Sequence, residues 1–484
     1  MLPRFSTAEA PRVNDATGCL DQSWPRTVIR STLLFLPSFL HMYMPTTETT
    51  ANHYYEPLSR QHHRSDTAFL DGMRGLAALC VFLEHFLLPF WNGIFYAYGG
   101  SEESQSLAQL PIVRLVYSGS PMVCIFFVIS GIVLSLKPAR LAQEGQWLQF
   151  YDILGSMAFR RGIRLFVPCI VASFVHMLIA QARWCNLRSV VEWEGPPEIH
   201  DEFWLKQPHH VPGFWTQMSQ WLDFLVDKVL IPSTWRGTTT GRDYGDLEHV
   251  EYGSQLWTVG IEYWSSILLF VVLLGTVKLG LVVKGLIITT LTGFSLWVSR
   301  WDIALFLFGS MLGHTVAFEP HLQANKKGIG GLIVFGPIFL LGLHLASYPE
   351  LNGSQTAGFS WLPLAGNSRL WQSIGASMIV FSLVNLDALK TIFSCRVLLY
   401  LGRISFAVYI THLPLLGVVG WRLVAFIWTL TGRATYVKEV GGVFIAFIIL
   451  LALQIWVADL FCRFVDEPCT RWASKVHECL TTTT

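Results

Sequence analysis

Two ionisable side chains, Arg74 and His85, stand eleven residues apart in the largely apolar stretch 68–91. A helix, at about 100° and 1.5 Å per residue, would place them about 20° apart around its axis and about 16 Å apart along it. They would then share a face, where a guanidinium can bind an anion and a neutral imidazole can accept a proton. Structural roles stay open as well, because Arg74 could reach lipid headgroups and His85 could be a packed, hydrogen-bonded core residue.

Polar side chains interrupt other apolar stretches too. Arg161 and Arg164 have the spacing that puts two guanidinium groups on one helix face, which suits phosphate oxygens. Glu262 begins a further stretch, and an unpaired carboxylate there would be costly, so we expect it to meet a cation or a wet cavity. His412 precedes Pro414, which frees backbone groups of a helix. The structural alternatives are basic residues that flank a membrane span, an ion pair of Glu262 and a helix cap by His412.

The composition places these side chains in a membrane protein. Of the 484 residues, 52% are hydrophobic and only 14% are charged, whereas about 25% are charged in an ordinary soluble domain. The formal net charge is +1, so no global field exists to hold nucleic acid. The nine cysteines include no C-x-x-C, which argues against a disulfide scaffold and against a metal site.

About ten apolar stretches are long enough to cross a bilayer, which takes about 20 residues each. The sequence therefore predicts an all-α, polytopic transmembrane helical bundle of about ten spans. Residues 415–430 could add an eleventh span or form a re-entrant hairpin. The predicted stretches are 68–91, 112–136, 164–181, 254–277, 279–298, 302–318, 329–347, 369–386, 397–418 and 440–463.

The flanking segments complete the predicted organisation. We expect residues 1–66 to form a poorly ordered cytosolic tail, residues 67–470 the transmembrane domain and residues 471–484 a cytosolic C-terminal tail. Lys and Arg gather in the links that this topology places in the cytosol, and the outer link 92–110 has neither. Asn352 begins the one glycosylation sequon, which falls in a predicted outer loop. The sequence thus indicates a multi-pass protein of an endomembrane or the plasma membrane, with both termini cytosolic.

Six segments, in order, resemble the motifs of the acyltransferase-3 family of polytopic membrane acyltransferases, and together they span most of residues 68–470. They are 70–78 (LDGMRGLAA) with the spacing from Arg74 to His85, 126–131 (FFVISG), 160–165 (RRGIRL) with Pro168, 256–258 (LWT) with Glu262, 402–405 (GRIS) with His412 and Pro414, and Glu467-Pro468. The chain departs from the family at Met122, where Gly is usual, and at Cys124, where an acid is common. These departures leave the acceptor open.

The resemblance implies an O-acyltransferase that moves an acyl group, most often acetyl, from acyl-CoA to a hydroxyl of a small metabolite or a glycan. Acyl-CoA would be a co-substrate, and no permanently bound cofactor is expected. The implied catalytic residues are His85, as general base, Arg74 and Glu262, whereas the implied acyl-CoA site consists of Arg74, Arg161, Arg164, Ser130 and His412. Two other classes stay open: a secondary transporter that uses the same buried charges, and a non-enzymatic membrane scaffold.

Overall fold

The structure, a computed structural model, describes residues 35–38, 67–102, 104–185, 208, 210–230, 252–318, 329–362 and 367–481. The chain forms two units, Met1–Thr46 and Thr47–Thr484. Only residues 35–38 of the first unit are described, so the tail expected over residues 1–66 lies almost wholly outside the described residues. The described part of the second unit is helical and has no strands, which confirms the predicted all-α class.

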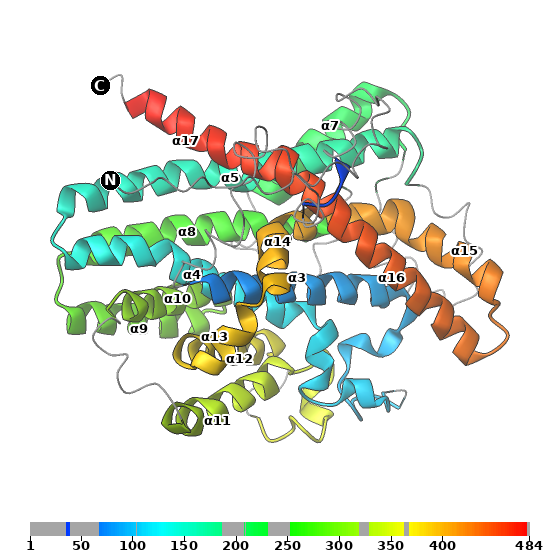
Figure 1. The fold of residues 1–484 in the computed structure, drawn as a ribbon, viewed down its shortest axis with the longest axis horizontal. Coiled ribbons are helices and arrows are strands. Elements are labelled where there is room, and N and C mark those ends of the chain that lie inside the picture. The colour runs from blue at the N-terminus through cyan, green and yellow to red at the C-terminus, as the bar shows by residue number, and fades with distance from the viewer. Residues whose placement is uncertain are drawn as a thin grey trace, which may run out of the picture. The chain divides into compact units, whose positions relative to one another are not determined.

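Helices make up most of the described part of the second unit, and the long links that follow α3 and α11 contain short 3₁₀ turns (Figure 1). The α-helices are α3 (Ala68–Leu87), α4 (Gly119–Gln143), α5 (Trp147–Gln181), α7 (Phe214–Phe224), α8 (Trp257–Thr276), α9 (Leu281–Trp297), α10 (Trp301–Phe318), α11 (Ile329–Ala346), α12 (Ser368–Asn385), α13 (Asp387–Phe393), α14 (Arg396–Leu415), α15 (Trp421–Thr431), α16 (Tyr436–Phe461) and α17 (Glu467–Thr481). The π-helical segments are η7 (Leu225–Leu230), η14 (Leu416–Gly420) and η15 (Cys462–Asp466).

Each of the ten predicted apolar stretches overlaps one of these helices. Five helical runs among the described residues are long and apolar enough to cross a membrane, and the bent pair α12 and α13, which meet at 98°, would make a sixth. The five are Gly119–Gln143, Trp147–Gln181, Ser254–Thr276, Arg396–Thr431 and Tyr436–Thr481. Helices α9, α10 and α11 are apolar but shorter. The count of about ten spans therefore stays a prediction.

Two segments differ from the layout expected from the sequence. Residues 415–430 continue α14 through η14 into α15, as one helical run from Arg396 to Thr431. Pro414 lacks the N–H of an ordinary helical residue, and the wider π-helical turn follows directly after it. Helix α17 packs against α5, so the border expected at residue 470 falls inside a helix.

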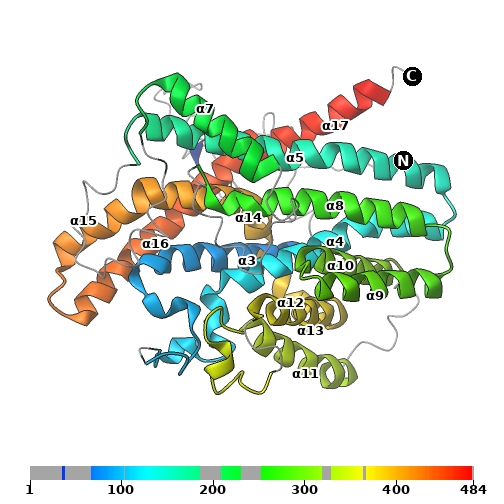
Figure 2. The same ribbon diagram turned by 180° about the vertical axis from the view of Figure 1, so that it is seen from behind.

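Close contact between glycines sets the spacing of the helix pairs that carry the polar residues. A Cβ on Gly75 of α3 would lie 2.6 Å from the backbone nitrogen of Gly402 on α14. In the same way, a Cβ on Gly131 of α4 would overlap the carbonyl oxygen of Phe306 on α10. Small residues of this kind let the backbones of membrane helices approach closely. Figure 2 shows α5, α8, α4 and α10 in adjacent rows, and each helix packs against the next.

Candidate active site

Two histidines, the partly buried His85 and the fully buried His412, face one another across the contact between α3 and α14. The ring centroids of His85 and His412 lie 4.9 Å apart, with 63° between the ring planes. Nδ1 of His85 lies 2.8 Å from the carbonyl oxygen of Val81, and Nδ1 of His412 lies 2.8 Å from that of Tyr409. Because carbonyl oxygens only accept hydrogen bonds, each Nδ1 carries the proton and donates. This tautomer makes Nε2 the basic nitrogen of both neutral rings.

The environment of His412 leaves its basic nitrogen available. His412 is fully buried, and its Nε2 has no hydrogen-bond partner in the part of the chain that the structure describes. Gln454 on α16 lies close by: its Nε2 donates to Oγ1 of Thr411, whereas its buried Oε1 is also without a partner there. A buried polar atom that lacks a partner is costly, so a polar ligand or water would be stabilised at either of these two atoms.

Tyr409 connects the imidazole pair to α8. Its hydroxyl donates to the carbonyl oxygen of Gln255 and lies 2.6 Å from Oγ1 of Thr258, and its ring centroid is 5.9 Å from that of His412. Gln255 in turn donates from Nε2 to the carbonyl oxygen of Ile410, at 2.7 Å. The start of α8 and the 3₁₀ turn Ser254–Leu256 that precedes it therefore fix the turn of α14 that carries His412. Sequence reasoning missed Tyr409, although its place three residues before His412 puts it beside that histidine on the helix.

Glu262 on α8 holds side chains from two other helices. Its Oε1 accepts from Nη2 of Arg161 on α5, at 2.6 Å, and from the hydroxyl of Ser130 on α4, at 3.0 Å. Arg161 also donates from Nε to the hydroxyl of Ser266, at 2.9 Å. The side chains of Arg161 and Glu262 are only 11% and 20% exposed. Glu262 thus meets a cation and neutralises one of the arginines of the implied acyl-CoA site.

The other two arginines of that site are less firmly paired. Nη1 of Arg74 lies 3.9 Å from Oδ1 of Asp71, at the outer limit of an ion pair. Among the described residues the exposed guanidinium of Arg164 has neither a hydrogen bond nor an ion pair. The charges of Arg74 and Arg164 both act on Arg161 and on Asp466 of η15. Helices α3 and α5 and the segment η15 therefore bring the three predicted arginines into one cationic site, which we call the arginine site.

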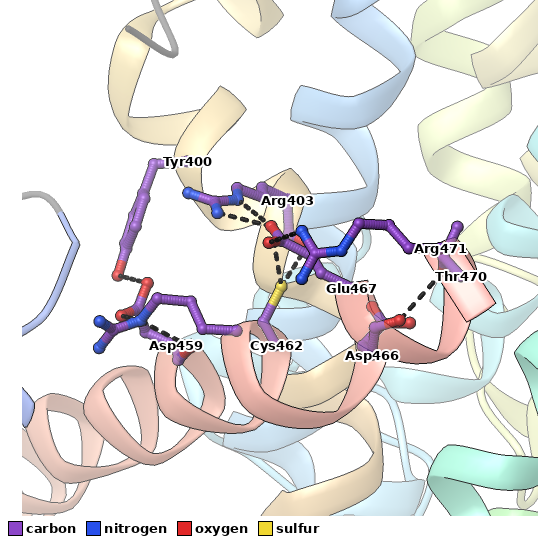
Figure 3. A network of polar contacts seen from close by, with 9 residues as sticks. Tyr400, Arg403, Asp459, Cys462, Asp466, Glu467, Thr470 and Arg471 are labelled. Carbon is purple, nitrogen blue, oxygen red and sulfur yellow. Dashed lines mark hydrogen bonds and ion pairs between the residues drawn. The ribbon is translucent and has the colours of Figure 1, made fainter. Parts of the chain in front are cut away.

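A polar network ties α14 to the junction of α16 and α17 (Figure 3). Arg403 donates from Nε and Nη2 to Oε1 of Glu467, and the Nε contact is 2.9 Å long. Asp459 accepts from the hydroxyl of Tyr400 at 3.2 Å and pairs with Nε of Arg463 at 2.9 Å. Arg403 and Glu467 come from the last two sequence motifs, so these motif residues position η15 against the arginine site.

Two residues point away from both clusters. Glu84 turns toward α4, where its carboxylate accepts from the backbone N–H of Gly119 and interacts with the charges of Glu350, Arg114 and Arg369. This group links the end of α3 to the start of α4. Asn352, the predicted glycosylation site, is exposed, and its amide donates to the carbonyl oxygen of Gly100 at 3.1 Å. Glycosylation of Asn352 stays a prediction.

The histidine pair and the arginine site lie at two levels of α3, within a bundle of apolar helices, which is the arrangement of a membrane-associated protein with a polar interior site. The comparison with protein families identifies the group: a family model described as an acyltransferase domain, acyltransferase-3, matches residues 67–462. The chain therefore belongs to the acyltransferase-3 family, and it is an enzyme that transfers acyl groups.

Fungal relatives align with nearly the whole chain. O-acetyltransferase PaAT-1 of Phomopsis amygdali is 29% identical over 442 residues, which are 85% of each chain. Acyltransferase clz18 of Cochliobolus lunatus is 27% identical over 85% of this chain and 96% of its own length, and acyltransferase R4 of a Phoma species is 26% identical over 87% and 98%. No solved structure matches the chain.

Proposed function

We propose that the protein is an O-acetyltransferase that moves an acetyl group from acetyl-CoA to a hydroxyl of a small metabolite. The observation that carries this proposal is the imidazole pair, whose hydrogen bonds leave Nε2 of each ring as a base. The name of PaAT-1, O-acetyltransferase, supports the choice of acetyl. Because both rings lie between packed helices, a small alcohol reaches them more easily than an internal hydroxyl of a glycan chain does, and a glycan is the second choice.

The proposed reaction is a direct transfer without an acyl-enzyme. Nε2 of His85 takes the proton of the acceptor hydroxyl as its oxygen attacks the thioester carbonyl. The tetrahedral intermediate then collapses, the C–S bond breaks, and the CoA thiolate receives the proton from His85. The products are the ester and CoA. The ring of His412, whose centroid lies 4.9 Å from that of His85, would hold the base in place by packing against it.

The donor would bind with its phosphates on Arg74 and Arg164. The thioester of acetyl-CoA lies at the far end of the pantetheine arm from these phosphates, so it can rise along α3 toward His85, about 16 Å away by helical rise. Arg161 and Ser130 both donate hydrogen bonds to Glu262, so we propose that they position Glu262 and do not bind phosphate. Acetyl-CoA is cytosolic, so the arginine site and both termini would face the cytosol from an endomembrane or the plasma membrane.

Two experiments test the proposal. The acceptor would be found by comparing the metabolites of a gene-deletion strain with those of the parent, since the deletion should accumulate a compound that lacks one acetyl group. With that compound and radiolabelled acetyl-CoA, the purified protein in nanodiscs should form the ester. His85→Gln should lower kcat about 100-fold or more, the usual contribution of a general base, and leave the KM for acetyl-CoA nearly unchanged.

The matched control is His210→Gln, because His210 is partly exposed and bonds the carbonyl oxygen of Gln181, away from the imidazole pair. It should keep the wild-type kcat. Full activity of His85→Gln would contradict the role of the base. Uptake of the compound into sealed vesicles without formation of an ester would instead support a transporter.

A further inference from the structure

Asp466 is a buried carboxylate beside a site that is proposed to bind anions. The residue is 9% exposed, and its Oδ1 is buried without a hydrogen-bond partner among the residues that the structure describes. In Figure 3 the residue is joined only to Thr470, whose hydroxyl donates to the backbone carbonyl oxygen of Asp466 and leaves the carboxylate unengaged. Burial of a carboxylate without hydrogen bonds is expensive, so something else must stabilise it.

The opposite charges that act on this carboxylate come from the arginine site, and they offset part of the cost of its burial. Arg164 of α5 and Arg74 of α3 both attract the carboxylate of Asp466, and η15 packs directly against α5. The pair of Arg403 and Glu467 pins the residue that follows Asp466 to α14. The position of Asp466 is thus fixed from two sides, and its charge is placed where the phosphates of acetyl-CoA would bind.

We infer that Asp466 is a built-in counter-ion of the arginine site, and that it weakens the binding of acetyl-CoA and of the product CoA alike. This inference rests on the proposed function, because it takes the phosphates of CoA as the ligands of Arg74 and Arg164. Acetyl-CoA and CoA carry the same phosphates, so a site that binds these groups too tightly would retain the product. A fixed negative charge lowers the affinity for both molecules equally and speeds the departure of CoA.

The size of the effect follows from Coulomb's law. Two unit charges about 10 Å apart, at an effective dielectric constant of about 20 to 40, have an interaction energy that corresponds to a roughly 4- to 16-fold change in the dissociation constant. Asp466→Asn should therefore bind CoA about tenfold more tightly than the wild type. The KM for acetyl-CoA and the inhibition constant for CoA should fall by similar factors, and kcat should fall where release of CoA limits turnover.

The experiment measures the binding of CoA to the full-length protein in nanodiscs by calorimetry. Adenosine 3′-phosphate 5′-diphosphate, the phosphate-bearing half of CoA, serves as a second probe and should show the same gain. Asp466→Glu keeps the charge and should keep affinity close to that of the wild type. Asp459→Asn removes a neighbouring buried carboxylate that Arg463 and Tyr400 already engage, so it should lower the melting temperature without raising the affinity for CoA.

The outcomes separate the inference from the function on which it rests. If the wild type binds neither probe, the proposed donor is wrong. If the wild type binds CoA but Asp466→Asn binds it no more tightly, the inference fails and the donor site stands. Should Asp466→Asn not fold, Asp466→Ser, which is also neutral and smaller, decides the question by the same measurement. A folded neutral variant with a lower melting temperature and unchanged affinity would show that Asp466 has a structural role only.

Discussion

The contact between Gly75 and Gly402 should control the distance between the two imidazoles. His85 lies ten residues beyond Gly75 on α3, and His412 lies ten residues beyond Gly402 on α14. The two helices therefore run parallel and in register from the glycine contact to the histidine pair. A methyl group added at the contact must push the helices apart, and the displacement is carried along both helices to the rings.

The change to test is Gly75→Ala. Its Cβ would lie 2.6 Å from the nitrogen of Gly402 and 2.8 Å from the carbonyl oxygen of Leu398, whereas ordinary contact begins at 3.4 Å. The backbones must therefore separate by about 0.8 Å, the difference between 3.4 and 2.6 Å. Overpacking of this kind costs about 1 to 3 kcal/mol of stability, and a displacement near 1 Å at reacting groups can cost up to about 100-fold in rate.

The assay compares kcat and the melting temperature of Gly75→Ala with those of Gly293→Ala. Gly293 lies inside α9, and a Cβ there would meet nothing within 4 Å, so this control adds the same methyl group without a clash. We expect kcat of Gly75→Ala to fall about 10- to 100-fold while the protein stays folded. A folded Gly75→Ala enzyme with the wild-type kcat would refute the idea that this helix contact sets the geometry of the imidazole pair.

Three further predictions concern single contacts. Arg161→Gln and Glu262→Gln should each destabilise the protein by about 3 kcal/mol, since each leaves a buried charge unpaired, and the double variant should be no less stable than either single one in a thermal double-mutant cycle. Arg164→Gln should raise the KM for acetyl-CoA about tenfold at a nearly constant kcat, whereas Arg160→Gln, which loses a hydrogen bond to Ser474, should not; steady-state kinetics decide this. Tyr409→Phe should lower stability by about 1 kcal/mol, because the carbonyl of Gln255 loses its shorter hydrogen bond and keeps only the one from Thr258 at 3.5 Å; equal denaturation midpoints would contradict this.

Features that depend on a single segment of the chain can be predicted from the sequence. The all-helical class follows from the length and composition of the apolar stretches, and each predicted stretch overlaps a helix. The shared face of Arg74 and His85 follows from helical geometry alone, and α3 runs without a break from Ala68 to Leu87. The motif order likewise suffices to identify the family, because it depends on residue types and not on contacts.

Pairings between helices could not be derived in the same way. The need of Glu262 for a cation is local, but the choice of Arg161 depends on how α5 and α8 lie side by side, and no spacing within either helix encodes that. Asp466 is a second case: it precedes the motif Glu467-Pro468, but only the packing of η15 on α5 brings it near enough to Arg164 for the two charges to interact. The sequence shows that a charged residue lies in an apolar stretch, but only the packing of the helices shows which residue pairs with it.

The arginine site and the imidazole pair both include a residue of α3, and α14 runs parallel to this helix from one site to the other. Arg74 sits beside the glycine contact, and His85 sits at the far end of the same face of α3, so a single rigid helix fixes the distance between the phosphate end of the donor and the base. Helix α14 meets α3 at both ends, through Gly402 and through His412. The phosphate end of a donor that bridges the two sites would be held at the arginine site by charge. The acceptor would then be selected only at the other end of the donor, beside the imidazole pair. Changes of acceptor among relatives should therefore concentrate near the imidazole pair and leave the arginine site unaltered.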